Sequence, residues 1–214
     1  MKFIIFLGSC FFLWIFIGNL RSHKSNRFDM YIGVPGSGKT TFAAYLAKKR
    51  FKKGKKNKKF GVVLSNVPIK GSYKVVKSDI GTYMIKDCLL IMDEAGIDYN
   101  NRNFKSFSHD ETYFYKFHRH YNVDIAMFSQ DFDIDLKLRK LATRIFIVNK
   151  SIFPGFVKRK QVSKKIGIDS ISKQLIDQYQ FVIFGTKYIY CPKLWKLFDS
   201  YSYKELPSKE FQKY

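Results

Sequence analysis

The chain has 214 residues with 39 Lys or Arg and 17 Asp or Glu, which gives a formal net charge of +22 at pH 7. Beyond an N-terminal hydrophobic stretch, this length leaves room for one domain of about 185 residues and excludes a second catalytic domain. The three cysteines lack the spacing of a zinc site or a disulfide framework, so neither is predicted. The basic excess favours nucleic acid or anionic lipid as a partner, but an A+T-rich genome also enriches Lys codons, so both readings stay open.

Residues 3–20 are mostly apolar and carry no charge. As a helix they extend about 27 Å, close to the ~30 Å hydrocarbon core of a bilayer, so they predict a single transmembrane span. The following linker, residues 21–27, is basic and only Lys2 precedes the span, so we expect the rest of the chain to lie in the cytoplasm. A cleaved signal peptide and a lipoprotein signal at Cys10 are the alternatives.

After the linker, short apolar runs alternate with helical stretches up to about residue 150. This pattern predicts an α/β fold with a mostly parallel sheet of about five strands flanked by helices. The expected strands lie at residues 28–32, 60–64, 88–92, 123–128 and 144–148, and the first helix runs from residue 39 to about 51. Further along the chain, residues 168–180 predict a helix and residues 181–190 a strand or hairpin.

The residues between the first strand and the first helix match G-x-x-x-x-G-K-[ST], a phosphate-binding P-loop. Its members are Gly33, Val34, Pro35, Gly36, Ser37, Gly38, Lys39 and Thr40, with Thr41 next to them. The glycines let backbone N–H groups surround phosphates, Lys39 is expected to reach the β and γ phosphates, and Thr40 to bind Mg²⁺. The predicted cofactors are ATP and Mg²⁺, with GTP as an open alternative. Because ATP is cytoplasmic, the motif also favours an uncleaved anchor over an export signal.

Two adjacent carboxylates, Asp93 and Glu94, end the apolar run at residues 89–92. An acid in this position lies at the carboxyl edge of a parallel sheet, beside the P-loop. We expect Asp93 to hold Mg²⁺ through its water shell and Glu94 to polarise the attacking water. The pair therefore indicates nucleotide hydrolysis.

Two further side chains are catalytic candidates. Gln130 follows another apolar strand, which is expected to lie between the P-loop strand and the acidic strand. From there Gln130 is expected to sense the γ phosphate or to position water. Ring-forming P-loop motors often receive an arginine from the adjacent subunit, and Arg119, Arg139 and Arg144 are candidates. Arg119 is the one assigned here, so a homo-oligomer is expected.

The segment from residue 48 to residue 59 has nine Lys or Arg in twelve positions. It lies at the end of the P-loop helix and in the loop behind it, away from the expected phosphate site. A solvated loop, contact with anionic lipid and a DNA track are the three readings, in that order of preference.

The order of these pieces resembles the Zot family, which includes the assembly ATPases of filamentous phages, within the FtsK/HerA-like motors. The P-loop and Asp93-Glu94-Ala95 are common to a large superfamily, whereas the other matching blocks are more particular. These blocks are Ser65-Asn66-Val67-Pro68, His118-Arg119-His120-Tyr121-Asn122-Val123-Asp124-Ile125, Ser129-Gln130, and Asp135-Leu136-Lys137-Leu138-Arg139. The resemblance covers residues 29 to about 150.

The resemblance implies a single-pass ATPase of the host membrane that powers filamentous virion assembly and extrusion of phage single-stranded DNA. Implied partners are the host membrane, phage single-stranded DNA, coat protein and other assembly proteins. Family members place the membrane span after the ATPase domain, whereas here it comes first, so toxin-like activity is not expected. The expected organisation is an anchor at 1–20, a linker at 21–27, a P-loop ATPase core at 28–150 and a C-terminal extension at 151–214.

Two other functions use the same motifs. A small-molecule P-loop kinase requires an acceptor pocket and an Arg-rich lid, and it predicts neither a membrane anchor nor the Asp93-Glu94 pair. A nucleotide-gated membrane scaffold for coat or pore proteins requires nucleotide binding without hydrolysis.

Overall fold

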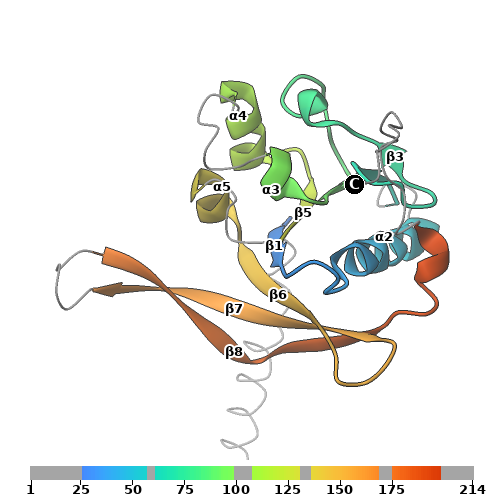
Figure 1. The fold of residues 1–214 in the computed structure, drawn as a ribbon. Helices are drawn as coiled ribbons and strands as arrows, with labels where there is room; N and C mark the ends of the chain where they lie inside the picture. Colours follow the sequence, from blue (N-terminus) through green and yellow to red (C-terminus); the bar gives the residue numbers. More distant parts are fainter. Residues whose placement is uncertain (1–25, 57–60, 99–107, 131–135, 169–174, 199–214) are drawn as a thin grey trace, which may run out of the picture.

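The computed structural model describes residues 26–56, 61–98, 108–130, 136–168 and 175–198 (Figure 1). They form an α/β fold around one eight-stranded mixed sheet with the strand order β3-β2-β4-β5-β1-β6-β7-β8. The strands are β1 (Phe28–Ile32), β2 (Val63–Ser65), β3 (Tyr73–Lys74), β4 (Leu89–Met92), β5 (Asp124–Ser129), β6 (Arg144–Lys150), β7 (Phe156–Ile168) and β8 (Leu175–Tyr190). The helices are α2 (Lys39–Lys56), α3 (Ala95–Asp98), α4 (His109–Phe117) and α5 (Leu136–Leu141), with short 3₁₀ turns η2 (Lys77–Asp79) and η3 (Trp195–Leu197).

Neighbouring strands from β3 to β6 run parallel, and β7 and β8 add to the sheet as antiparallel strands. β5 lies between β1 and β4, as predicted for the strand that ends at Gln130. Because parallel strands place their carboxyl ends at one edge, the segments that follow β1, β4 and β5 meet there. The topology therefore assembles one site from three distant parts of the sequence.

All five predicted strands form, with small differences at their ends, but the expected number of about five was too low. The predicted helix at residues 168–180 is wrong from residue 175 onward, because β8 begins there and pairs along β7. Residues 169–174 lie outside the described ranges. Pairing with the long antiparallel strand β7 outweighs the local helical pattern of these residues. A single sequence does not reveal this pairing.

No helix within the described ranges is long and apolar enough to cross a membrane. The predicted span at residues 3–20 lies outside these ranges, so it stays a prediction.

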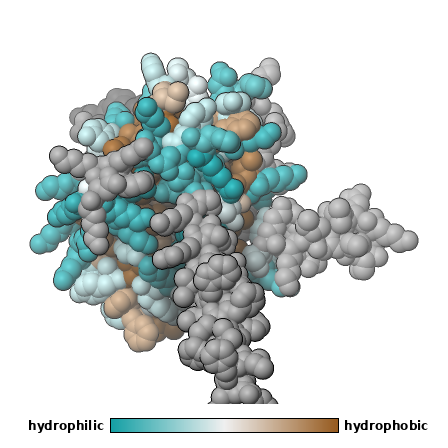
Figure 2. Space-filling model, turned by 180° about the vertical axis from the view of Figure 1, so that it is seen from behind, coloured by the Kyte–Doolittle hydropathy of each residue, from teal (hydrophilic) through white to brown (hydrophobic). Residues whose placement is uncertain are grey.

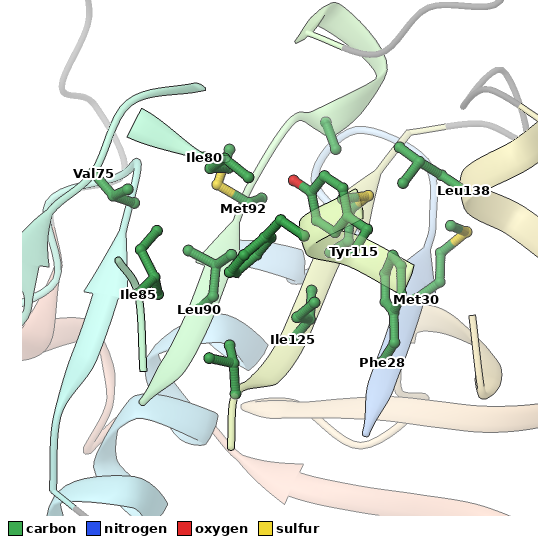
Figure 3. Packing of buried hydrophobic residues seen from close by; sticks show 14 of the residues in the cluster. Phe28, Met30, Val75, Ile80, Ile85, Leu90, Met92, Tyr115, Ile125 and Leu138 are labelled. Carbon is green, nitrogen blue, oxygen red and sulfur yellow. The ribbon is translucent and has the colours of Figure 1, made fainter. Parts of the chain in front are cut away.

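Helices cover both faces of the central strands. The alternation along β1 sends Phe28, Met30 and Ile32 to one face, where α4 and α5 pack, and Tyr31 to the other face, where α2 packs. Figure 3 shows the first of these clusters, with Tyr115 of α4 against the β1 side chains; the rings of Tyr115 and Phe28 stack at 5.7 Å. A strand buried on both faces is typical of the centre of a parallel α/β sheet.

Local chemistry explains where the helices begin. α2 starts directly after Gly38, at the end of the P-loop. α4 starts with a capping box, in which the Ser108 hydroxyl accepts from the Glu111 N–H at 3.0 Å and the Glu111 carboxylate accepts from the Ser108 N–H at 3.1 Å. Both bonds satisfy backbone donors that the first helical turn leaves unpaired.

The β7–β8 hairpin extends past the helices to one side of the body (Figure 1). One face of its base packs on the core, through the buried side chains of Val157 and Ile189. Lys187 also donates to the Tyr45 hydroxyl of α2 at 2.6 Å. The hairpin base is therefore part of the domain, although its sequence belongs to the extension that had no assigned role.

The surface seen from behind is mostly hydrophilic, with apolar side chains in separate patches (Figure 2). This agrees with a chain in which basic residues outnumber acidic ones 39 to 17. The described surface in this view offers no continuous apolar face.

Candidate nucleotide site

The P-loop follows β1, and a backbone hydrogen bond ties its first residue to the neighbouring strand β5. The Gly33 N–H donates to the carbonyl of Ser129 at 3.1 Å, which ties the start of the loop to the end of β5. Gly38 has φ +96°, and a Cβ there would lie 2.4 Å from a methyl carbon of Val157 on β7. Only glycine fits this position, because any side chain would collide with β7 and strain the backbone.

Lys39, the first residue of α2, folds back over the loop. Its ammonium group donates to the carbonyl of Gly33 at 2.7 Å and to that of Val34 at 3.1 Å, and the residue is 7% exposed. The positive charge therefore lies within the curve of the loop, at the N-terminus of an 18-residue helix. Both features favour a bound anion.

Thr40 and Asp93 meet across the edge of the sheet. The Thr40 hydroxyl donates to the Asp93 carboxylate at 2.7 Å, and Asp93 is 4% exposed. Burial raises the pKa of Asp93, while the hydrogen bonds from Thr40 and from the Glu94 N–H act in the opposite direction. A buried carboxylate next to a hydroxyl is an arrangement of hard oxygen donors that suits Mg²⁺.

The Thr40 hydroxyl and the Asp93 carboxylate suit Mg²⁺, but they are too few for a metal that needs several protein ligands. Within the part of the chain that the structure describes, no three His, Cys, Asp or Glu side chains cluster as a metal site would require. Mg²⁺ is commonly held by one or two protein oxygens together with phosphate and water, so Thr40 and Asp93 suffice.

Glu94 and Gln130 approach each other from neighbouring strand ends. Gln130 donates through its amide nitrogen to the Glu94 carboxylate at 3.4 Å, and both side chains are exposed. Glu94 has φ +51°, a left-handed backbone conformation that is uncommon outside glycine. Such local strain is typical of functional sites, and here it orients the carboxylate that follows Asp93.

Asn66 is a site residue to which the sequence assigned no role. It follows β2, and its side-chain amide donates to the Asp93 carbonyl at 2.8 Å while its oxygen accepts from the Asp93 N–H at 2.7 Å. This two-way bond fixes the backbone that carries both carboxylates. The available signal was the polar residue at the end of a third parallel strand, next to the acidic strand.

A family model described as Zonular occludens toxin (Zot) matches residues 45–203, which is more than half of the 214-residue chain. The chain belongs to the Zot family. The match begins within α2, so the P-loop of this Zot-family chain rests on its own motif and geometry. No curated protein matches the sequence significantly.

Solved structures with similarity to this Zot-family chain include the N-terminal domain of zonular occludens toxin from Neisseria meningitidis. It is 17% identical with a TM-score of 0.47, and the alignment covers 82% of this chain and 100% of that chain. The genome packaging NTPase B204 from Sulfolobus turreted icosahedral virus 2, in complex with ATP-gammaS, is 12% identical with a TM-score of 0.44, covering 72% and 96%. Residue roles in the present chain come from its own contacts.

The structure does not bring Arg119 to the P-loop of its own chain. Its guanidinium donates to the Thr143 hydroxyl at 3.4 Å and its carbonyl accepts from Asn26, both at the amino ends of β1 and β6. Arg144 is bound within its own chain, because its guanidinium donates to the buried carboxylate of Asp29 at 2.8 Å. Arg139 lies on α5 with its Nε buried. A role for Arg119 in a neighbouring subunit stays a prediction.

The family-specific block around Arg119 forms a network at the amino edge of the sheet, opposite the P-loop. Asp124 accepts from the Arg50 guanidinium of α2 at 3.0 Å and from the Arg27 N–H at 3.1 Å. The Asn122 amide donates to the Asp87 carboxylate at 2.5 Å. These contacts join α2, β4 and β5, so the most particular sequence signature in this Zot-family chain has a structural role here.

His118 in the same block is 3% exposed. Its Nδ1 bonds the Tyr115 carbonyl at 2.8 Å, and its Nε2 has no hydrogen-bond partner among the described residues. Burial lowers the pKa of His118, so the folded protein holds a neutral imidazole. His118 is therefore a core residue at the C-terminal end of α4.

We expect His118→Gln to flatten the pH dependence of stability on the acidic side. An unfolded histidine takes up its proton near pH 6.5, whereas the buried one resists, so wild-type stability is complete above this pH and falls below it, by at most about 1.4 kcal/mol per pH unit. The free energy of unfolding, measured by urea denaturation at pH 7.5 and 5.5, should drop less in the variant. His109, whose side chain is 95% exposed, provides the control substitution His109→Gln. Equal pH dependence in wild type and His118→Gln would contradict the assignment.

Proposed function

We propose that this Zot-family chain is a membrane-anchored ATPase that powers filamentous virion assembly and extrusion of phage single-stranded DNA through the host membrane. The observation that carries the ATPase part is the convergence of Lys39, the Thr40–Asp93 pair and the Glu94–Gln130 pair at one sheet edge. Virion assembly rests on family membership, and the anchor rests on the apolar run at residues 3–20.

Each side chain has a distinct part in hydrolysis. The Lys39 ammonium leaves the loop carbonyls and neutralises charge on the β and γ phosphates. Thr40 and Asp93 would hold Mg²⁺, which would supply positive charge to polarise the γ-phosphoryl group. Glu94 accepts a proton from the attacking water, and Gln130 positions Glu94 by the contact that it already makes.

In this proposal the ATPase domain faces the cytoplasm and works as a homo-oligomer. An oligomer accounts for an arginine supplied by a neighbour, since Arg119 lies far from the P-loop within one chain. Coat protein and other assembly proteins complete the set of proposed partners.

We expect Lys39→Ala to abolish ATP binding and Glu94→Gln to keep binding but lower the turnover number on the order of 100-fold, because a general base is removed while the phosphate contacts remain. Turnover and ATP affinity are measured on the full-length chain in detergent with Mg²⁺. Lys49→Ala, an exposed lysine on the same helix, is the matched control and should behave as wild type.

Wild-type turnover in Glu94→Gln would rule out its role as the base. Binding without hydrolysis in the wild type, together with virion release by Glu94→Gln, would favour the scaffold. Transfer of the γ-phosphoryl group to a small acceptor would favour the kinase.

The outer face of the β7–β8 hairpin supports the DNA part of the proposal. Lysines and aromatic rings share this face: the Lys160 ammonium lies 3.8 Å from the centre of the Phe181 ring, and the Lys158 ammonium lies 5.9 Å from that of Tyr188. Phe181 and Tyr188 are 55% and 49% exposed. Exposed rings between cations provide stacking surfaces for bases and charges for phosphates, which suits single-stranded nucleic acid.

We expect the double variant Lys158→Glu and Lys160→Glu to bind a labelled single-stranded oligonucleotide at least tenfold more weakly, with ATP turnover in the absence of DNA unchanged, because two phosphate contacts become repulsive. Fluorescence anisotropy at several salt concentrations measures the affinity. The control, Lys74→Glu with Lys86→Glu, makes the same change in net charge at two exposed positions, one in β3 and one before β4. Equal losses in both double variants would show that only net charge matters.

A further inference from the structure

A cavity of about 280 Å³ opens beside the P-loop. One wall is the loop from Gly36 to Gly38, with Thr41. The other wall comes from the end of β6, the turn after it and the start of β7, without Ile152, and from Cys191 and Trp195. The volume is close to the lower end of the range for small-molecule pockets, about 300 Å³.

The cavity is lined by P-loop residues but not by the hydrolytic residues. Thr40, Asp93 and Glu94 lie outside its lining, whereas Gly36 and Thr41 belong to it. A nucleoside triphosphate with its γ phosphate at Asp93 and its α phosphate at Thr41 would have its sugar and base at the cavity.

The cavity rim is aromatic and exposed. Trp195 is 55% exposed and Phe153 is 65% exposed, although large apolar side chains normally lose much of their surface on folding. The turn that carries Phe153 is held by its own hydrogen bond, because the Ser151 hydroxyl accepts from the Phe153 N–H at 3.2 Å. Exposed rings on an ordered rim are surfaces available for stacking on a flat ligand.

The polar groups of the cavity suit a phosphate or a sugar better than a base edge. Lys150 reaches the loop, with its ammonium nitrogen 3.9 Å from the position that a Cβ on Gly36 would occupy. Among the described residues that line the cavity, no side chain is Asp, Glu, Asn or Gln. The lining therefore lacks the carboxylate and amide groups that usually read the hydrogen-bonding edge of a base.

We propose that this cavity binds the base and ribose of the nucleotide, with Trp195 and Phe153 stacking on the base and Lys150 beside the α phosphate or ribose. The inference rests on the proposed ATPase function. Stacking does not discriminate between bases, and the lining side chains are not of the types that usually recognise a base edge. The site therefore takes purine nucleoside triphosphates without strong preference between ATP and GTP. The extension after residue 150 thereby completes the nucleotide site.

The test compares nucleotides with inorganic tripolyphosphate, which has the phosphates but no base. Isothermal titration calorimetry on the full-length chain in detergent with Mg²⁺ should give ATP and GTP affinities within about fivefold of each other. Trp195→Ala and Phe153→Ala should each weaken ATP and GTP by about tenfold and leave tripolyphosphate within twofold, because only stacking is lost. Trp195→Phe should retain most of the affinity. Ile152→Ala is the matched control, since Ile152 is 99% exposed in the same turn but lies outside the lining.

The outcomes separate this inference from the ATPase function. If the wild type binds neither ATP nor tripolyphosphate, the proposed function fails and the base site fails with it. If ATP binds but both alanine variants keep wild-type affinity, or lose tripolyphosphate equally, the base lies elsewhere while the ATPase function stands. A preference above 100-fold for ATP or GTP would overturn binding by stacking alone.

Discussion

The parallel pairing of β4, β5 and β1 is the constraint on which the site depends. Each strand delivers one piece to the same edge: the P-loop after β1, Asp93 and Glu94 after β4, and Gln130 after β5. The backbone bond from Gly33 to Ser129 and the side-chain bond from Thr40 to Asp93 then join these pieces directly. A different strand order would separate these pieces, so the geometry of the site depends on the topology of the sheet.

The two edges of the sheet have different roles. At the carboxyl edge, a buried carboxylate is kept close to two hydrogen-bond donors, and its desolvation is a cost that the folded chain carries for function. At the amino edge, the Arg50–Asp124 pair and the Asn122–Asp87 bond hold α2, β4 and β5 together. Because α2 begins at Lys39 and contains Arg50, one helix connects the phosphate site to this network. The network at the amino edge thus supports the helix that carries Lys39 of the candidate nucleotide site.

The sequence predicted what depends on local pattern and missed what depends on long-range pairing. The P-loop and the Asp93-Glu94 pair are contiguous motifs, and their strand context located them correctly at one edge. Arg119 precedes β5, so parallel pairing places it at the edge opposite to Gln130, an inference that the motif alone does not supply. Of the β7–β8 hairpin, the sequence predicted a strand or hairpin at residues 181–190, where β8 lies, but not the pairing with β7. The cavity brings together Gly38, Val157 and Trp195, which are far apart in the chain and follow no shared period. Asn66 stood out as a polar residue after a strand and as a member of the Ser65-Asn66-Val67-Pro68 block, but neither signal gave it a role.

The most direct test of the central claim is an experimental structure of the full-length chain with Mg²⁺ and a non-hydrolysable ATP analogue. We expect a metal ion at the Thr40 hydroxyl and close to Asp93, so that the direct Thr40–Asp93 bond is replaced. We also expect the Lys39 ammonium on the β and γ phosphates and Glu94 facing the γ phosphate. An analogue bound away from the P-loop, or bound there with the Lys39 and Thr40 contacts unchanged, would contradict the proposed site.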